Sequence, residues 1–175
     1  MKKLLLLLVV VNFLGCRTAY LPDTKDVKEF FAQMDNGILS EKKFLLINKI
    51  TGDEGEHKHF KEYYARQDTI LTELEIKSIV KAMAGSHKGI WTNKYFDSAK
   101  IVSKEYIDSV TKQNQNWTPP AHYTFSLPWF SNDNKFAVLS FEHYCGRLCG
   151  EWSVGLYKKV NGRWFFVKFY DVIFS

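Results

Sequence analysis

The sequence lacks the motifs by which common enzyme classes are recognised. It contains no G-x-S-x-G elbow, no P-loop, no dinucleotide-binding glycine pattern, no H-E-x-x-H pair and no EF-hand loop. These absences do not exclude an enzyme, but they leave no motif that supports one. We therefore favour a non-enzymatic protein, and we predict no catalytic residue, no cofactor and no metal site.

The chain also lacks a strong excess of charge of one sign. It has 24 basic and 19 acidic side chains and a net charge of +5 at pH 7. A protein that binds nucleic acid gathers Lys and Arg on one face, whereas the two signs are nearly balanced here. The sequence therefore argues against a nucleic-acid partner.

The apolar run at the N-terminus is too short to cross a membrane comfortably. Leu4 to Val11 follow two lysines, whereas a membrane-spanning helix needs about 20 apolar residues. A charged start, a short apolar stretch and a small residue before the cleavage point are typical of a secretion signal. We predict that residues 1–15 are a signal peptide.

The end of this leader, Leu14-Gly15-Cys16, resembles the lipobox of bacterial lipoproteins. The match is incomplete, because Phe13 stands where that family usually has Leu. The resemblance implies cleavage before Cys16 by signal peptidase II and attachment of lipid, such as palmitate, to this cysteine. It also implies anchoring to a membrane of the cell envelope, facing the periplasm or associated with the outer membrane, with residues 16–23 as lipidated cysteine and tether. The alternatives are an ordinary secretory signal and an N-terminal anchor helix.

Beyond the tether, the apolar pattern predicts a single α+β domain over residues 24–175. Apolar residues recur at helical spacing in three stretches, which run from Thr24 to Gly37, from Thr72 to Gly85 and from Ser103 to Val110. Compact apolar runs predict strands over residues 42–50, 136–144, 151–160 and 163–174. Residues 54–70 fit either a helix or a strand, and we favour a return strand.

This order of elements predicts helices packed on an antiparallel sheet that ends in a three-stranded meander. The alternative is a cone like that of the nuclear-transport-factor-2-like fold, in which helices wrap a curved sheet around an aromatic pocket. Asn161-Gly162 predicts a two-residue type I′ turn between the last two strands. Counting from that turn pairs Leu156 with Val167, Val154 with Phe169 and Trp152 with Asp171. We expect this set to face the core.

An aromatic stripe lies on the opposite face of the predicted meander. It consists of Leu139, Phe141, Tyr157, Trp164, Phe166 and Tyr170. Either helices cover this stripe, or it faces a pocket or a partner. We favour burial, because the helices have apolar faces that need cover. Phe141, Tyr157, Trp164 and Tyr170 remain candidates to face a ligand.

Cys145 and Cys149 flank a predicted three-residue loop, Gly146-Arg147-Leu148. Opposed Cα atoms of antiparallel strands lie about 4.5–5.5 Å apart, which a disulfide spans. Because an exported chain meets an oxidising compartment, we predict a structural disulfide. A redox pair usually takes the form C-x-x-C at a helix start, and a zinc site needs further ligands; both remain as alternatives.

The same register places His143 opposite Glu151. This pair is a candidate acid/base dyad or ligand contact, although a surface ion pair is the commoner arrangement. His57 and His59, with Glu54 or Glu56, are a weaker metal candidate that we assign to solvated surface. A deep pocket with His143 or His122 beside a buried carboxylate would favour an enzyme.

The C-terminal hairpin, with CGRLCG and an aromatic last strand, resembles the ending of uncharacterised small lipoproteins of Gram-negative bacteria. That resemblance implies no activity. Our first hypothesis is a lipid-anchored, non-enzymatic binding or accessory domain, whose partner is an envelope protein, a glycan or a small ligand. The second is a small ligand-binding or enzymatic cone with an aromatic pocket, and the third is a thiol-redox or metal protein.

Overall fold

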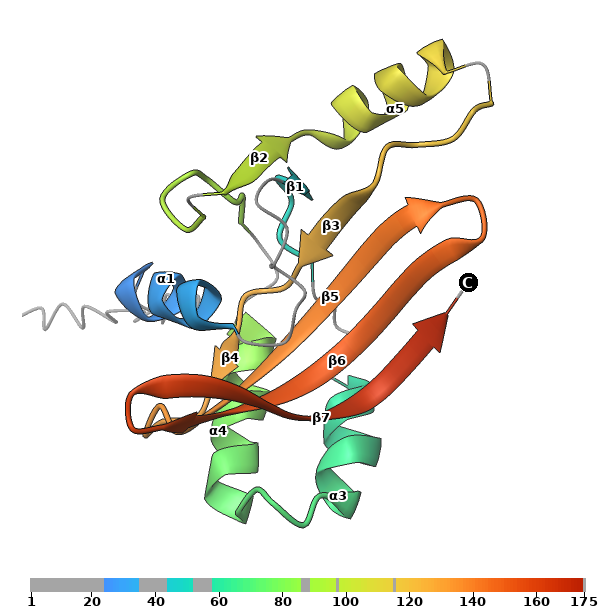
Figure 1. The fold of residues 1–175 in the computed structure, drawn as a ribbon. Coiled ribbons are helices and arrows are strands. Elements are labelled where there is room, and N and C mark those ends of the chain that lie inside the picture. Colours follow the sequence, from blue (N-terminus) through green and yellow to red (C-terminus); the bar gives the residue numbers. More distant parts are fainter. Residues whose placement is uncertain are drawn as a thin grey trace, which may run out of the picture.

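A seven-stranded mixed sheet forms the centre of the fold (Figure 1). The computed structural model describes residues 24–34, 44–51, 58–85, 89–96, 98–114 and 116–174. The elements are α1 (Thr24–Gln33), β1 (Phe44–Ile47), the π-helical turn η1 (Phe60–Tyr64), α3 (Ala65–Gln67), α4 (Glu73–Gly85), β2 (Ala99–Val102), α5 (Lys104–Gln113), β3 (His122–Phe125), β4 (Trp129–Phe130), β5 (Phe136–Gly146), β6 (Cys149–Val160) and β7 (Arg163–Phe174). The α+β class and the C-terminal meander β5–β6–β7 are confirmed.

The sheet has the strand order β2-β1-β3-β5-β6-β7, and β4 pairs with β5 outside this path. β1 runs parallel to both β2 and β3, and the other pairs are antiparallel. The sheet is therefore mixed: it is antiparallel from β3 to β7, as we expected, and parallel around β1. The segment between β1 and β2 includes η1, α3 and α4, and a long crossover of this kind is what allows parallel pairing.

The helix starts follow from local capping. At α4, one carboxylate oxygen of Glu75 accepts hydrogen bonds from the Thr72 amide and hydroxyl, both at 2.7 Å, which forms a capping box. At α5, the Ser103 hydroxyl oxygen accepts from the Tyr106 amide at 3.2 Å. The helices predicted to begin at Thr72 and Ser103 are confirmed. The predicted end of the first helix, Gly37, lies outside the described residues.

Residues 58–67 are helical, so the return strand that we favoured there is wrong. Phe60 and Tyr64 stand four positions apart and are both buried, at 1% and 7% exposure. Because residues at i and i+4 share one face of a helix, this pair fits a helix that packs on the sheet. His59 lies on this segment and is exposed, while Glu54, Glu56 and His57 lie outside the described residues.

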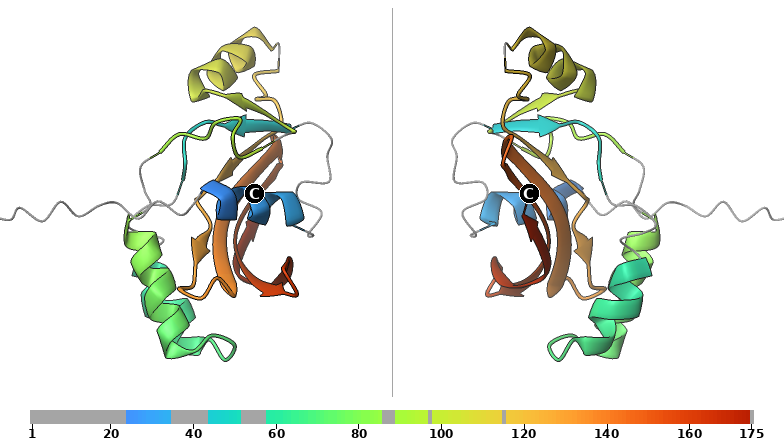
Figure 2. Two further views of the ribbon diagram at one scale, coloured as in Figure 1. Left: turned by 90° about the vertical axis from the view of Figure 1, so that its left-hand side faces the viewer. Right: turned by 90° about the vertical axis from the view of Figure 1, so that its right-hand side faces the viewer.

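Two core clusters occupy the two faces of the sheet, and the alternation along β5 separates them. The first cluster joins α1 to Ala137, Leu139 and Phe141, and the second joins η1 and α4 to Phe136 and Val138. Figure 2 shows α3 and α4 together to one side of the strands. Both faces are therefore buried, unlike in the alternative cone, in which helices leave a cavity over one curved face.

The β6–β7 hairpin keeps the predicted turn but not the predicted register. Asn161 and Gly162 have φ angles of 50° and 77°, as a type I′ turn requires, and pairing runs as predicted from Val160–Arg163 to Tyr157–Phe166. Two β-bulges follow, so that Leu156 pairs with Lys168, Val154 with Asp171 and Trp152 with Ile173. The three pairs predicted beyond the turn, Leu156–Val167, Val154–Phe169 and Trp152–Asp171, are therefore wrong.

Candidate functional site

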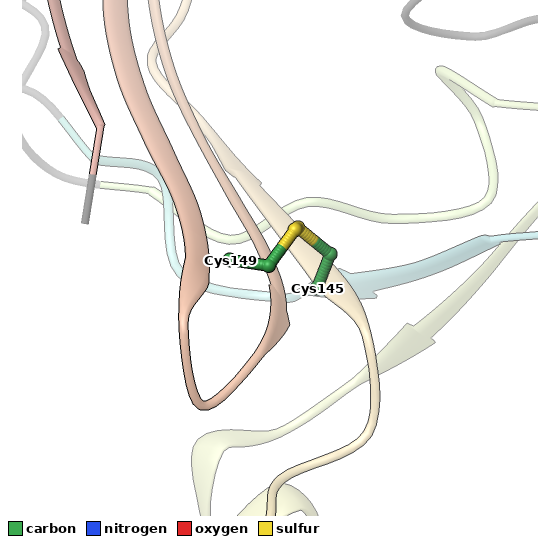
Figure 3. Close-up of a disulfide and its surroundings, with 2 residues drawn as sticks. All are labelled: Cys145 and Cys149. Carbon is green, nitrogen blue, oxygen red and sulfur yellow. A yellow bond between two sulfur atoms is a disulfide. The ribbon is translucent and has the colours of Figure 1, made fainter.

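The cysteines lie where β5 turns into β6, and they are joined (Figure 3). The predicted disulfide Cys145–Cys149 is confirmed, with Cα atoms 5.0 Å apart. The loop is tighter than expected, because Gly146 pairs directly with Cys149 and leaves Cys145 as a bulge. Gly146 has a φ of +142°, which side-chain-bearing residues rarely adopt. The disulfide thus closes a two-residue turn, Arg147-Leu148.

This setting offers little for redox or metal chemistry. Both cysteines lie on strands, so the pair has no helix start of the kind that lowers a thiol pKa. Within the described ranges, no three His, Cys, Asp or Glu side chains come together where they could hold a metal ion. The geometry therefore favours a structural bond.

His143 lies directly opposite Glu151, as predicted, but each side chain has another neighbour. The His143 ring stacks on Tyr123, with centroids 4.1 Å apart and planes 6° apart. Glu151 accepts a hydrogen bond of 2.7 Å from the Ser153 hydroxyl. His143 and Glu151 are both half-buried and lie near the disulfide end of the sheet. The ring of the first is held by stacking, and the carboxylate of the second by a hydrogen bond.

The aromatic candidates pack into the two core clusters, although Trp164 also borders an open space of about 230 Å³ between Gln33 and Arg163. Phe141, Tyr157 and Trp164 are 2%, 0% and 2% exposed and belong to the first core cluster, because α1 covers their face. Tyr170 packs against the second cluster on the other face, since the bulges in β7 change its direction. Phe141 and Tyr157 were therefore wrong as ligand-facing candidates, whereas Trp164, at the border of that space, and half-buried Tyr170 stay candidates. The burial interpretation holds for the stripe as a whole.

The interior near the second cluster is almost filled. The space between Phe60, Met83, Trp129 and their neighbours measures about 10 Å³, roughly the room of one water molecule. His122 does not line it, since its ring stacks on Tyr144 with centroids 5.3 Å apart.

An open groove of about 570 Å³ lies between α4 and the turn that joins β4 to β5. Its lining residues are mostly polar or charged in type, and they comprise Thr72, Leu74, Glu75, Lys77, Ser78, Lys81, Asn132, Asp133 and Lys135. Ser78 ties the two walls together by accepting a hydrogen bond of 3.2 Å from the Asn132 amide. At the rim, hydrogen bonds from Lys135 and Ser131 lower the pKa of Asp133 to about 2. Sequence reasoning missed this groove, because no local pattern links two segments so far apart.

A buried carboxylate, Asp68, was also missed. Its side chain is 0% exposed and lies 2.7 Å from the Lys168 ammonium group, and it accepts a hydrogen bond of 2.6 Å from the Tyr170 hydroxyl. Burial raises its pKa, but the hydrogen bonds from Lys168, Tyr170 and two backbone amides outweigh burial and lower the pKa overall. With its oxygens occupied by donors, Asp68 is a structural anchor rather than a free general base.

Compared with known proteins, the chain matches no family model, no curated protein and no solved structure. Cys16 lies outside the described residues. In the part of the chain that the structure describes, no helix has the length and apolar character needed to cross a bilayer. The function must therefore be argued from the residues themselves.

Proposed function

We propose that this protein is an exported lipoprotein, held in the cell envelope by acyl chains on Cys16, whose domain binds a partner without catalysing a reaction. The observation that carries the proposal is the bond between Cys145 and Cys149. Such bonds persist in oxidising compartments and are rare in the cytosol. Together with the lipobox-like end of the leader, this bond gives each of the three cysteines a role in an exported protein.

Three features of the domain support binding over catalysis. The space enclosed at the second core cluster is too small for a substrate, while the larger groove beside α4 is open; the Asp68 carboxylate is occupied by donors, and His143 stacks on Tyr123. Some large apolar side chains are exposed to solvent: Leu148 is 94%, Phe174 75% and Trp117 68% exposed. Each of these side chains is free of cover by the domain's own core and is available for contact with another molecule. The partner class is an envelope protein, a glycan or a small ligand.

The tether would hold the domain close to the membrane. Residues 17–23 can span at most about 25 Å when fully extended. α1 begins at Thr24 and packs on the first core cluster through Val27, Phe30 and Phe31. The lipid attachment would therefore be coupled through α1 to the sheet, and the domain could not move far from the bilayer.

The lipid anchor is tested by metabolic labelling of the full chain in a Gram-negative host. With a clickable palmitate analogue, we expect the wild-type protein to be labelled, to sediment with membranes and to lose residues 1–15. The Cys16→Ala variant should be neither labelled nor processed at this position. The matched control, Cys145→Ala with Cys149→Ala, should keep the label. An unlabelled wild-type protein that retains its leader, with both remaining thiols reduced, would contradict the proposal.

A further inference from the structure

β7 is an outer strand of the sheet and is unusually long for one. It has 12 residues and pairs with β6 on one side, while among the described residues no strand pairs with its other side (Figure 1). Four large apolar side chains on it are exposed: Phe165 at 43%, Phe169 at 40%, Ile173 at 56% and Phe174 at 75%. A long, apolar outer strand is a template for pairing with another strand.

The usual protection of such an edge is weak here. Natural proteins place charged side chains or proline on exposed edge strands, but residues 166–174 contain no proline and only two charged residues. Lys168 is paired with buried Asp68 at 2.7 Å, and Asp171 accepts a hydrogen bond from the Tyr64 hydroxyl. Both charged side chains therefore interact on one face of the sheet, and they do not repel a strand that approaches the open edge of β7.

The bulges protect only part of the strand. They interrupt the pairing between Tyr157 and Val154 on the β6 side, whereas the last four residues of β7 pair with β6 in unbroken register. The C-terminal end of β7 therefore keeps the regular backbone that a further strand requires.

We propose that β7 pairs edge to edge with β7 of a second copy of this chain, in antiparallel orientation. Phe169, Val172 and Phe174 pair with Gly155, Ser153 and Glu151, which alternate along β6, so the three lie on one face. Pairing centred on Val172 sets the two Val172 residues opposite each other and places Phe174 of each copy opposite the partner's bulge, at Tyr170 next to Phe169. The exposed aromatic side chains of each strand thus supply the contact that the other needs.

The choice of a second copy follows from symmetry and rests on the proposed lipid anchor. Antiparallel pairing of two identical edges places the two-fold axis normal to the sheet. Such an axis keeps the same face of both sheets on the same side, so both α1 helices, which pack on the first core cluster, lie on one side. Two tethers that precede α1 can then reach one membrane. Anchoring in a common plane also raises the effective concentration of the two copies.

Sedimentation equilibrium of the full chain, purified from membranes in density-matched detergent, tests this pairing. We expect the wild-type protein to have twice the mass of one chain. Val172→Lys should raise the dissociation constant by about tenfold or more, because the two ammonium groups would meet at the two-fold axis. The matched control is Leu74→Lys on α4, which adds the same charge at a side chain that is 78% exposed and should leave the dimer intact.

A second variant guards against misfolding. Phe174→Lys, at the end of the strand, should also weaken the dimer, because it replaces an aromatic contact with the partner's bulge by a charge, and thermal melting must show that both edge variants remain folded. A monomeric wild-type protein, or a dimer that neither edge variant weakens, would overturn the pairing. Mass spectrometry of Cys16 on the same samples separates the two proposals: a lipidated monomer overturns the pairing alone, and an unlipidated dimer overturns the anchor alone.

Discussion

Tyr170 on β7 donates a hydrogen bond of 2.6 Å to Asp68, which lies 102 residues earlier in the chain. The carboxylate also accepts hydrogen bonds from the backbone amides of Ile70 and Leu71, at 2.6 and 2.8 Å. Lys168, two residues before Tyr170, supplies the countercharge at 2.7 Å. One buried carboxylate therefore fixes the turn after α3 to the bulged part of β7.

Replacing this carboxylate should cost much more stability than replacing an exposed one. Asp68→Asn leaves Lys168, whose side chain is 33% exposed, without its countercharge and weakens the hydrogen bonds that the buried carboxylate accepts, so we expect a loss of about 2 kcal/mol. The matched control is Asp133→Asn, whose ion pair with Lys135 is 40% exposed on the Asp133 side; it should cost less than about 1 kcal/mol. Urea denaturation measures both losses. Equal losses would contradict the anchoring role of Asp68.

The lowered pKa of Asp68 predicts acid sensitivity. Because the pKa of this carboxyl in the folded state lies below its ordinary value of 3.8, the folded state binds fewer protons than the unfolded state in this range. The stabilisation is therefore complete above the unfolded pKa and is lost as the pH falls through the folded pKa. Denaturation curves between pH 6 and pH 2 should show a steeper acid decline for the wild type than for Asp68→Asn. Parallel declines would exclude Asp68 as the source.

Sequence reasoning succeeded where the signal is local. Asn161-Gly162 specifies its turn through the φ angles of two adjacent residues, and Thr72 specifies a helix start through a carboxylate three residues away. The pairing of Cys145 with Cys149 belongs to the same class, because a tight hairpin alone brings the two together.

It failed where distant partners decide the geometry. The bulges of β7 direct Lys168 and Tyr170 toward Asp68. The sequence of β7 alone does not predict this contact, because Asp68 lies about a hundred residues earlier in the chain. The parallel pairing of β1 likewise depends on strands that follow long crossovers. For the candidate site, the opposition of His143 and Glu151 was predictable from register, whereas the groove beside α4 was not.

Reduction of the disulfide should destabilise the domain modestly. The ring that Cys145 and Cys149 close is small, with a sequence separation of 4, so the loop-closure model gives about 2 kcal/mol. Chemical denaturation with and without a reducing agent measures the difference, and the loss should be absent in a variant with both cysteines replaced by alanine. A reduced protein as stable as the oxidised one would show that the bond does not stabilise the fold.

Two buried tryptophans allow a matched test of one hydrogen bond. Trp91 and Trp164 are 1% and 2% exposed; the Trp91 indole N–H donates to the Phe125 carbonyl oxygen at 3.1 Å, whereas the Trp164 indole N–H has no partner among the described residues. Replacing either by Phe removes the same volume, so the cavity terms are similar. The Phe125 carbonyl also accepts from the Thr51 amide at 2.9 Å and would not be left unpaired.

Trp91→Phe should therefore cost about 1 kcal/mol more than Trp164→Phe, which is the net value of one hydrogen bond. Removing the indole N–H of Trp164 also relieves a buried donor that lacks an acceptor, and this relief acts in the same direction. Thermal and urea unfolding of the two variants under identical conditions give the difference. A larger loss for Trp164→Phe than for Trp91→Phe would contradict this prediction. It would mean that the indole N–H of Trp164 donates a hydrogen bond, which the structure does not show.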